Sequence, residues 1–66
     1  MTKSAEAYKA AAQTFKEKGD RHYAKGCAAA AEGDKDTANK EHAAAQTCYR
    51  SMNAALESAK RAKTNN

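Results

Sequence analysis

Apolar and small residues recur along the chain at alternating steps of three and four, the spacing that lines one face of an α-helix. The first series runs through Ala5, Tyr8, Ala12, Phe15, Gly19, His22, Gly26 and Ala29. The second runs through Ala38, His42, Ala45, Tyr49, Met52, Leu56 and Ala59. No stretch alternates with a period of two, which is the pattern of a half-buried strand. The sequence therefore predicts an all-α fold with two long helices, each bearing one packed stripe.

The break between the two series falls at residues 32–36, where a glycine is followed by two aspartates. Gly33 suits a helix C-terminus, and either Asp34 or Asp36 can cap the next helix. We expect a first helix over about 3–32, opened by Thr2 or Ser4, a turn at 32–36 and a second helix over about 37–62. Residues 63–66 are predicted to fray. Because the connection is short, residues 1–66 should form a single domain, an antiparallel two-helix hairpin.

The two stripes are predicted to meet in one core seam. Its members are Tyr8, Ala12, Phe15, Gly19, His22, Gly26, His42, Ala45, Tyr49, Met52 and Leu56. Folding about the turn brings residues whose numbers sum to about 69 to the same level, so that Gly19 lies opposite Tyr49 and Gly26 opposite His42. Glycine inside a helix costs about 0.5–1 kcal/mol relative to alanine, and each glycine here should leave room for a ring. The alternative is that Gly19 and Asp20 divide the first helix into two.

Composition changes this prediction, because the seam holds few large side chains. Eighteen of the apolar residues are alanine, and Val, Ile, Trp and Pro are absent. Burying a large apolar side chain is worth roughly 1.5–3 kcal/mol, while ordering one residue costs about 1.5 kcal/mol. A lone hairpin of this composition is therefore close to zero net stability. We expect a second copy to complete the interior, giving a homodimeric four-helix bundle with coiled-coil-like packing.

Part of the chain resembles a single tetratricopeptide unit, a helical hairpin with small residues at set offsets. Gly26, Gly33, Asp34, Ala38 and Ala45 stand where that pattern has its two glycines, the residue after the second glycine and its two second-helix alanines. The stretch over 15–26 resembles the first helix of such a unit in a different frame. The resemblance implies hairpin packing and protein binding, and it implies that one unit alone is not stable.

In size and plan the chain also resembles Rop-type dimeric hairpins, which assemble into four-helix bundles and bind paired RNA loops. That resemblance implies binding of RNA or DNA. The first helix offers a basic side for phosphate contacts, formed by Lys16, Lys18, Arg21 and Lys25. Acidic residues interrupt this side, and we expect no exposed aromatic ring to stack on a base. A solvated charged face is the alternative interpretation.

Charge is distributed unevenly between the two ends of the predicted hairpin, and the formal net charge is +4. The open end carries Lys3, Lys9, Lys60, Arg61 and Lys63. The turn carries Glu32, Asp34 and Asp36. Such a rod favours an antiparallel arrangement of two copies, because each acidic end then lies beside a basic one. The alternative is that these charges only complement the helix dipoles.

The remaining residues with chemical potential are His22, Cys27, His42 and Cys48. They are low-ranking metal candidates, because the ligands on one helix are five or six residues apart and not the three or four that share a face. We therefore expect no metal and no cofactor. The two cysteines are out of register for a disulfide within one chain. Reduced thiols fit a cytoplasmic protein, and no third group orients a catalytic pair, so no enzyme is expected.

The function that the sequence favours is a small interaction module that associates with itself and binds another protein, as an adaptor or inhibitor does. Surplus alanine surface at residues 10–11 and 28–31 favours it. The alternative is a Rop-like binder of RNA or DNA that uses the basic side of the first helix. No run of about eighteen apolar residues is present, so no membrane partner is expected.

Overall fold

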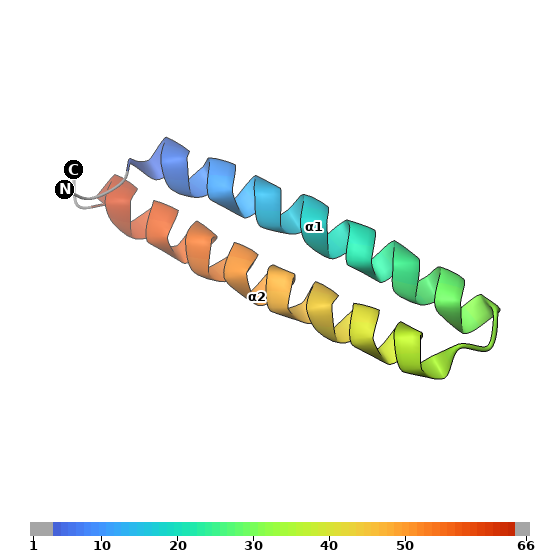
Figure 1. Cartoon of the computed structure of the whole chain (residues 1–66). Helices are drawn as coiled ribbons and strands as arrows, with labels where there is room; N and C mark the ends of the chain where they lie inside the picture. The colour runs from blue at the N-terminus through green and yellow to red at the C-terminus, as the bar shows by residue number, and fades with distance from the viewer. Residues whose placement is uncertain (1–3, 65–66) are drawn as a thin grey trace.

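The computed structural model describes residues 4–64, and their side chains as far as residue 62. Two helices, α1 (Ala5–Ala31) and α2 (Lys35–Thr64), run antiparallel and side by side along their whole length (Figure 1). The rod that they form measures 50 × 16 × 13 Å. The predicted all-α hairpin is confirmed, and within the described residues there is no strand. The second helix continues through 63–64, which we expected to fray, while residues 1–3 and 65–66 lie outside the described part.

Side-chain and backbone hydrogen bonds fix the helix ends. The hydroxyl of Ser4 accepts from the amide of Ala7 at 3.2 Å, so Ser4 is the N-cap of α1. At the other end Gly33 has φ of 83°, in the left-handed region that favours glycine. The amide of Asp34 donates to the carbonyl of Ala29 at 2.9 Å and closes a Schellman-type turn. The Asp34 carboxylate then accepts from the amide of Thr37 at 3.1 Å, so α2 begins at residue 35, two residues earlier than predicted.

The interior of the hairpin is built from alanine and glycine. Its buried apolar residues in the described part are Ala12, Ala29, Ala38, Ala45, Ala55 and Ala59. Gly19 and Gly26 are buried with them. No larger side chain of the described part is fully buried. Small side chains let the two helix axes approach closely, and alanine methyl groups then fill much of the space between them.

The large seam residues border this interior and do not fill it. Tyr8, Phe15, His22, His42, Tyr49 and Met52 are half-buried. Leu56, which we expected in the seam, is 41% exposed. The reason is a rotation of α2: the stripe through Glu41, Cys48 and Ala55 turns toward α1, and Leu56 moves to the flank.

α1 is continuous through both of its internal glycines, so the alternative of a break at Gly19 is wrong. A β-carbon placed on Gly19 would lie 2.6 Å from Cε1 of Tyr49. A β-carbon on Gly26 would overlap the ring of His42. The predicted pairing of each glycine with a ring of α2 is confirmed. Neither helix of the described part is long and apolar enough to cross a bilayer.

Candidate interaction surface

The two exposed large apolar side chains of the described part, Tyr23 and Leu56, lie on one face of the hairpin. On α1, Lys9, Lys16 and Tyr23 follow one another at seven-residue intervals, which places them on one stripe. On α2, His42, Tyr49 and Leu56 form a stripe in the same way. The rings of Tyr23 and His42 lie 5.2 Å apart, so the two stripes border a common surface. We call these six residues the tyrosine face.

Tyr23 is the most exposed large apolar residue of this face, with 55% of its surface accessible. The sequence reasoning missed it, because it expected no exposed aromatic ring. Its position in the sequence could have indicated this exposure. Tyr23 directly follows the seam residue His22 and therefore points about 100° around the helix from it. An exposed tyrosine offers a large apolar ring and a polar tip, a combination that is common at protein interfaces.

A hydrogen-bonded chain of three residues holds the middle of the tyrosine face. The Tyr49 hydroxyl donates to the Asp20 carboxylate at 2.6 Å, and Lys16 pairs with the same carboxylate at 3.2 Å. The Tyr49 hydrogen bond, and after it the Lys16 bond, lowers the pKa of Asp20 below 3.8. In return the Asp20 carboxylate raises the pKa of Tyr49 from 10.0 to about 12. These interactions link α1 to α2 at the surface of the hairpin, where few apolar side chains pack between the helices.

The tie between Tyr49 and Asp20 should make stability depend on pH at both extremes. Because folding lowers the pKa of Asp20, the ionised Asp20 carboxylate contributes to stability above pH 3.8. This contribution is lost as pH falls through the lowered pKa. Because the Tyr49 pKa is raised, its contribution is present below pH 10.0 and is lost as pH rises through about 12. The melting temperature should therefore exceed that of Tyr49→Phe between these limits only. A difference independent of pH would contradict the tie.

A groove runs along the tyrosine face beside Leu56, near the open end of the hairpin. Its first part is lined by Lys9, Ala12, Gln13, Lys16, Met52 and Leu56. It continues past Asn53, Glu57, Ala59 and Lys60. The floor is apolar, because Ala12 and Ala59 are buried there, and the rim is polar with an excess of lysine. We call this the Leu56 groove.

His42 occupies the part of the tyrosine face nearer the turn. Its ring fills the space left by Gly26 and lies against the ring of Tyr23. The Nε2 atom is buried and has no hydrogen-bond partner. Packing and not hydrogen bonding therefore positions this ring.

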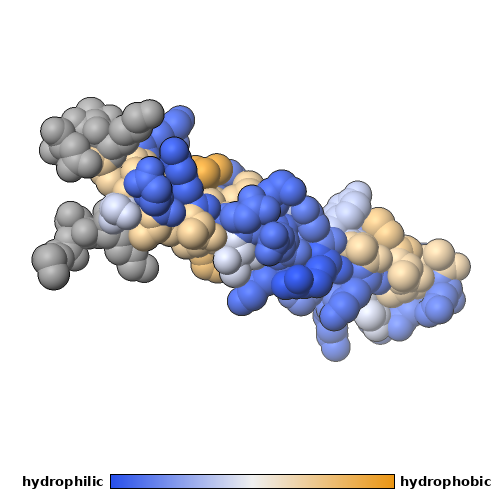
Figure 2. Space-filling view, turned by 90° about the horizontal axis from the view of Figure 1, so that it is seen from above, coloured by the Kyte–Doolittle hydropathy of each residue, from blue (hydrophilic) through white to orange (hydrophobic). Residues whose placement is uncertain are grey.

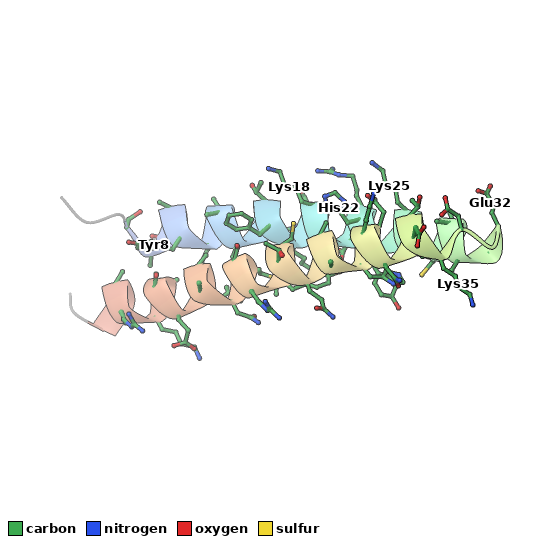
Figure 3. The ribbon with its side chains drawn as sticks, turned by 60° about the horizontal axis from the view of Figure 1, so that its bottom comes forward. Tyr8, Lys18, His22, Lys25, Glu32 and Lys35 are labelled. Carbon is green, nitrogen blue, oxygen red and sulfur yellow. The ribbon has the colours of Figure 1, made fainter. Side chains whose placement is uncertain are left out.

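The opposite face of the hairpin carries His22 and most of the predicted basic side. His22 Nδ1 and the Glu41 carboxylate lie 3.3 Å apart, a second polar tie between the helices. Lys18 and Lys25 project from the same side as His22, away from α2 (Figure 3). The predicted phosphate contacts are therefore divided, because Lys16 belongs to the tyrosine face.

The four low-ranking metal candidates do not come together as one site. His22 pairs with Glu41, and His42 packs against Tyr23. Cys27 is an exposed free thiol and Cys48 a half-buried one. Among the residues that the structure describes, no group of three or more His, Cys, Asp and Glu side chains could hold a metal ion.

The ends of the hairpin differ in charge, as the sequence indicates. Lys9 and Lys60 line the groove near the open end, while Glu32 and Asp34 lie at the turn. Lys3 lies outside the described residues, and the side chain of Lys63 is also outside them. Apolar surface is visible near both ends of the rod, with a hydrophilic middle between them (Figure 2).

Comparison of the chain with models of known families, with curated proteins and with solved structures gave no match. The resemblances to a tetratricopeptide unit and to Rop-type hairpins therefore stay predictions, and the function is argued from the surface itself.

Proposed function

We propose that the chain is a non-enzymatic helical interaction module that associates with a second copy of itself and binds another protein, as an adaptor or inhibitor does. One observation supports this most directly: within the described residues only alanine and glycine are buried, while Tyr23 and Leu56 stay exposed. A hairpin whose largest apolar groups face water gains by covering them. Covering the tyrosine face of one copy with another would give the homodimeric four-helix bundle.

The free energies of burying apolar side chains also favour self-association. An alanine contributes one methyl group to an interior, worth roughly 0.8 kcal/mol per buried carbon. Fully burying a tyrosine or leucine that the hairpin leaves exposed adds about 1.5–3 kcal/mol for each side chain. A symmetric dimer buries each of them twice. Self-association therefore supplies the apolar burial that the isolated hairpin lacks.

Leu56→Asp should abolish self-association, because it places a charge in the apolar centre of the groove. We expect the wild-type protein to change from monomer to dimer across a concentration series in analytical ultracentrifugation, and the variant to stay monomeric. Ala54→Asp is the matched control, since Ala54 is exposed on the same helix. It should dimerise like the wild type. A wild-type protein that remains monomeric at every concentration overturns the proposal.

Surface alanines near the turn support the binding of a further protein. Ala28, Ala30 and Ala31 are exposed, while Ala29 between them is buried in the hairpin. Small apolar side chains let a partner helix approach closely. Ala28 and Ala31 lie outside the stripes of the tyrosine face, so self-association leaves them accessible, whereas Ala30 continues the α1 stripe seven residues beyond Tyr23.

The alternative function, binding of RNA or DNA, is favoured by one specific observation. Lys18, Arg21 and Lys25 are exposed and form no ion pair within the described part of the chain. Three phosphate contacts per chain would make affinity fall steeply with salt, with a logarithmic slope of about −0.9 for each contact on duplex DNA. Replacing the three residues by glutamine should then remove binding to a duplex measured by fluorescence anisotropy. Binding that is absent at low salt excludes this alternative.

A further inference from the structure

The two exposed large apolar side chains of the described part lie on either side of the middle of the rod. The midpoint of α1 is Lys18. Residues whose numbers sum to 68 are level, as the contacts of Gly19 with Tyr49 and of Gly26 with His42 show. Leu56 is therefore level with Ala12, which lines the same groove. Tyr23 lies five residues beyond Lys18 toward the turn, and Leu56 lies six residues from it toward the open end. At 1.5 Å per residue these offsets are about 8 and 9 Å.

We propose that the second copy packs antiparallel on the tyrosine face, about a two-fold axis level with Lys18, so that Tyr23 of each copy enters the Leu56 groove of the other. This inference rests on the proposed self-association and specifies its geometry. A two-fold axis across the rod reverses height, so it exchanges the levels of Tyr23 and Leu56. One operation thereby covers both exposed apolar groups of both copies.

The groove suits a tyrosine in shape and polarity. Ala12, Met52 and Leu56 line it, and these apolar side chains can receive the ring. Gln13 and Asn53 stand at the rim and can hydrogen-bond the phenol hydroxyl. The acidic turn of a second copy is a poorer occupant, because residues 28–38 contain no apolar side chain larger than alanine.

The distribution of charge favours an antiparallel dimer over a parallel one. Lys9 lies nine residues from the midpoint, so the two copies of Lys9 would be about 27 Å apart along the rod, well beyond a Debye length of about 10 Å. Lys16 would be level with Asp20 of the other copy, since each lies two residues from Lys18. In a parallel dimer the lysines of both open ends would instead meet at one level, which is destabilising.

The face is also large enough for a stable dimer. A specific interface of standard size buries roughly 800 Å² on each partner, and the rod presents a side of 50 by 16 Å. Most of the length of the tyrosine face would be used, from Lys9 at one end to His42 at the other.

A charge exchange tests this geometry. Tyr23→Glu and Leu56→Lys should each weaken dimerisation by at least about tenfold, because each places one charge in an apolar contact. The double variant should recover to near the wild-type dissociation constant, since the new carboxylate of one copy meets the new ammonium group of the other. In a parallel dimer the two positions stay about 16 Å apart along the rod, and no recovery occurs. Ala24→Glu with Ala54→Lys, both exposed on the outer surface, is the matched control and should change nothing.

Disulfide crosslinking provides a second measurement that does not depend on recovery of affinity. Cys27 lies nine residues from Lys18, so in the antiparallel dimer it is level with Lys9 of the other copy. Within one chain the two positions are about 27 Å apart along a helix and cannot be bridged. In a Lys9→Cys, Cys48→Ala variant, mild oxidation should therefore link positions 9 and 27 between chains, as peptide mass spectrometry would show.

The outcomes separate this inference from the function on which it rests. Dimers in which the double charge variant stays weak, or in which crosslinks join only identical positions or none form, overturn the antiparallel geometry and leave self-association standing. A wild-type chain that is monomeric throughout overturns both.

Discussion

Ala45→Leu should destabilise the protein by about 3 kcal/mol, at the upper end of the usual cost of overpacking a close-packed interior. Ala45 is the most buried alanine, with 1% of its surface exposed. A leucine there has no space unless the two helix axes move apart, and such a movement would break the contacts of every other alanine along the rod. Thermal unfolding followed by circular dichroism at fixed protein concentration measures the effect.

Ala43→Leu is the matched control, because Ala43 is exposed two residues earlier on the same helix. Leucine and alanine have similar helix propensity, so this variant should melt within a few degrees of the wild type. If Ala45→Leu melts at the same temperature as the control, the two helices do not pack through alanine as described.

Gly19→Ala should also destabilise the protein, although alanine is the better helix former by about 1 kcal/mol. The added methyl group would lie 2.6 Å from the Tyr49 ring. The ring must swing outward, and its hydrogen bond to Asp20 is then lost. Overpacking of about 1–3 kcal/mol exceeds the gain in propensity, so we expect a net loss of roughly 1 kcal/mol.

A double-mutant cycle isolates the cause of this loss. In a Tyr49→Ala background the ring is absent, and Gly19→Ala should then stabilise the protein by its helix propensity alone. The change of sign between the two backgrounds is the expected result. Destabilisation of equal size in both would show that the ring is not the obstacle.

The sequence was sufficient to predict the hairpin because local chemistry and long-range pattern agree. Gly33 and Asp34 mark the turn by their backbone and capping preferences. Alanine-rich stripes at heptad spacing predict the two rods, and the internal glycines predict which rings of α2 face them. Each of these signals comes from residues with one strong preference, for a backbone conformation, a capping position or a helix face, and these preferences agree with one another.

The rotation of α2 could not be predicted in the same way. Small side chains continue its stripe on one side, at Cys48 and Ala55, so turning the helix in that direction changes little in packing. The choice depends on a few larger contacts between the helices, such as the tie from Tyr49 to Asp20 and the pair of His22 with Glu41. Such contacts have no periodic signature, and Leu56 was therefore placed in the seam.

An interior of methyl groups also determines how the protein responds to temperature. Alanine has no rotamers to lose on folding, and it exposes little apolar area on unfolding. The heat-capacity change of the hairpin should consequently be small, and its stability curve shallow and broad. If the chain dimerises as proposed, burial of the exposed Tyr23 and Leu56 side chains would supply most of this curvature. We therefore expect the curvature of stability with temperature to increase with self-association, because the alanine interior of a single hairpin contributes little to it.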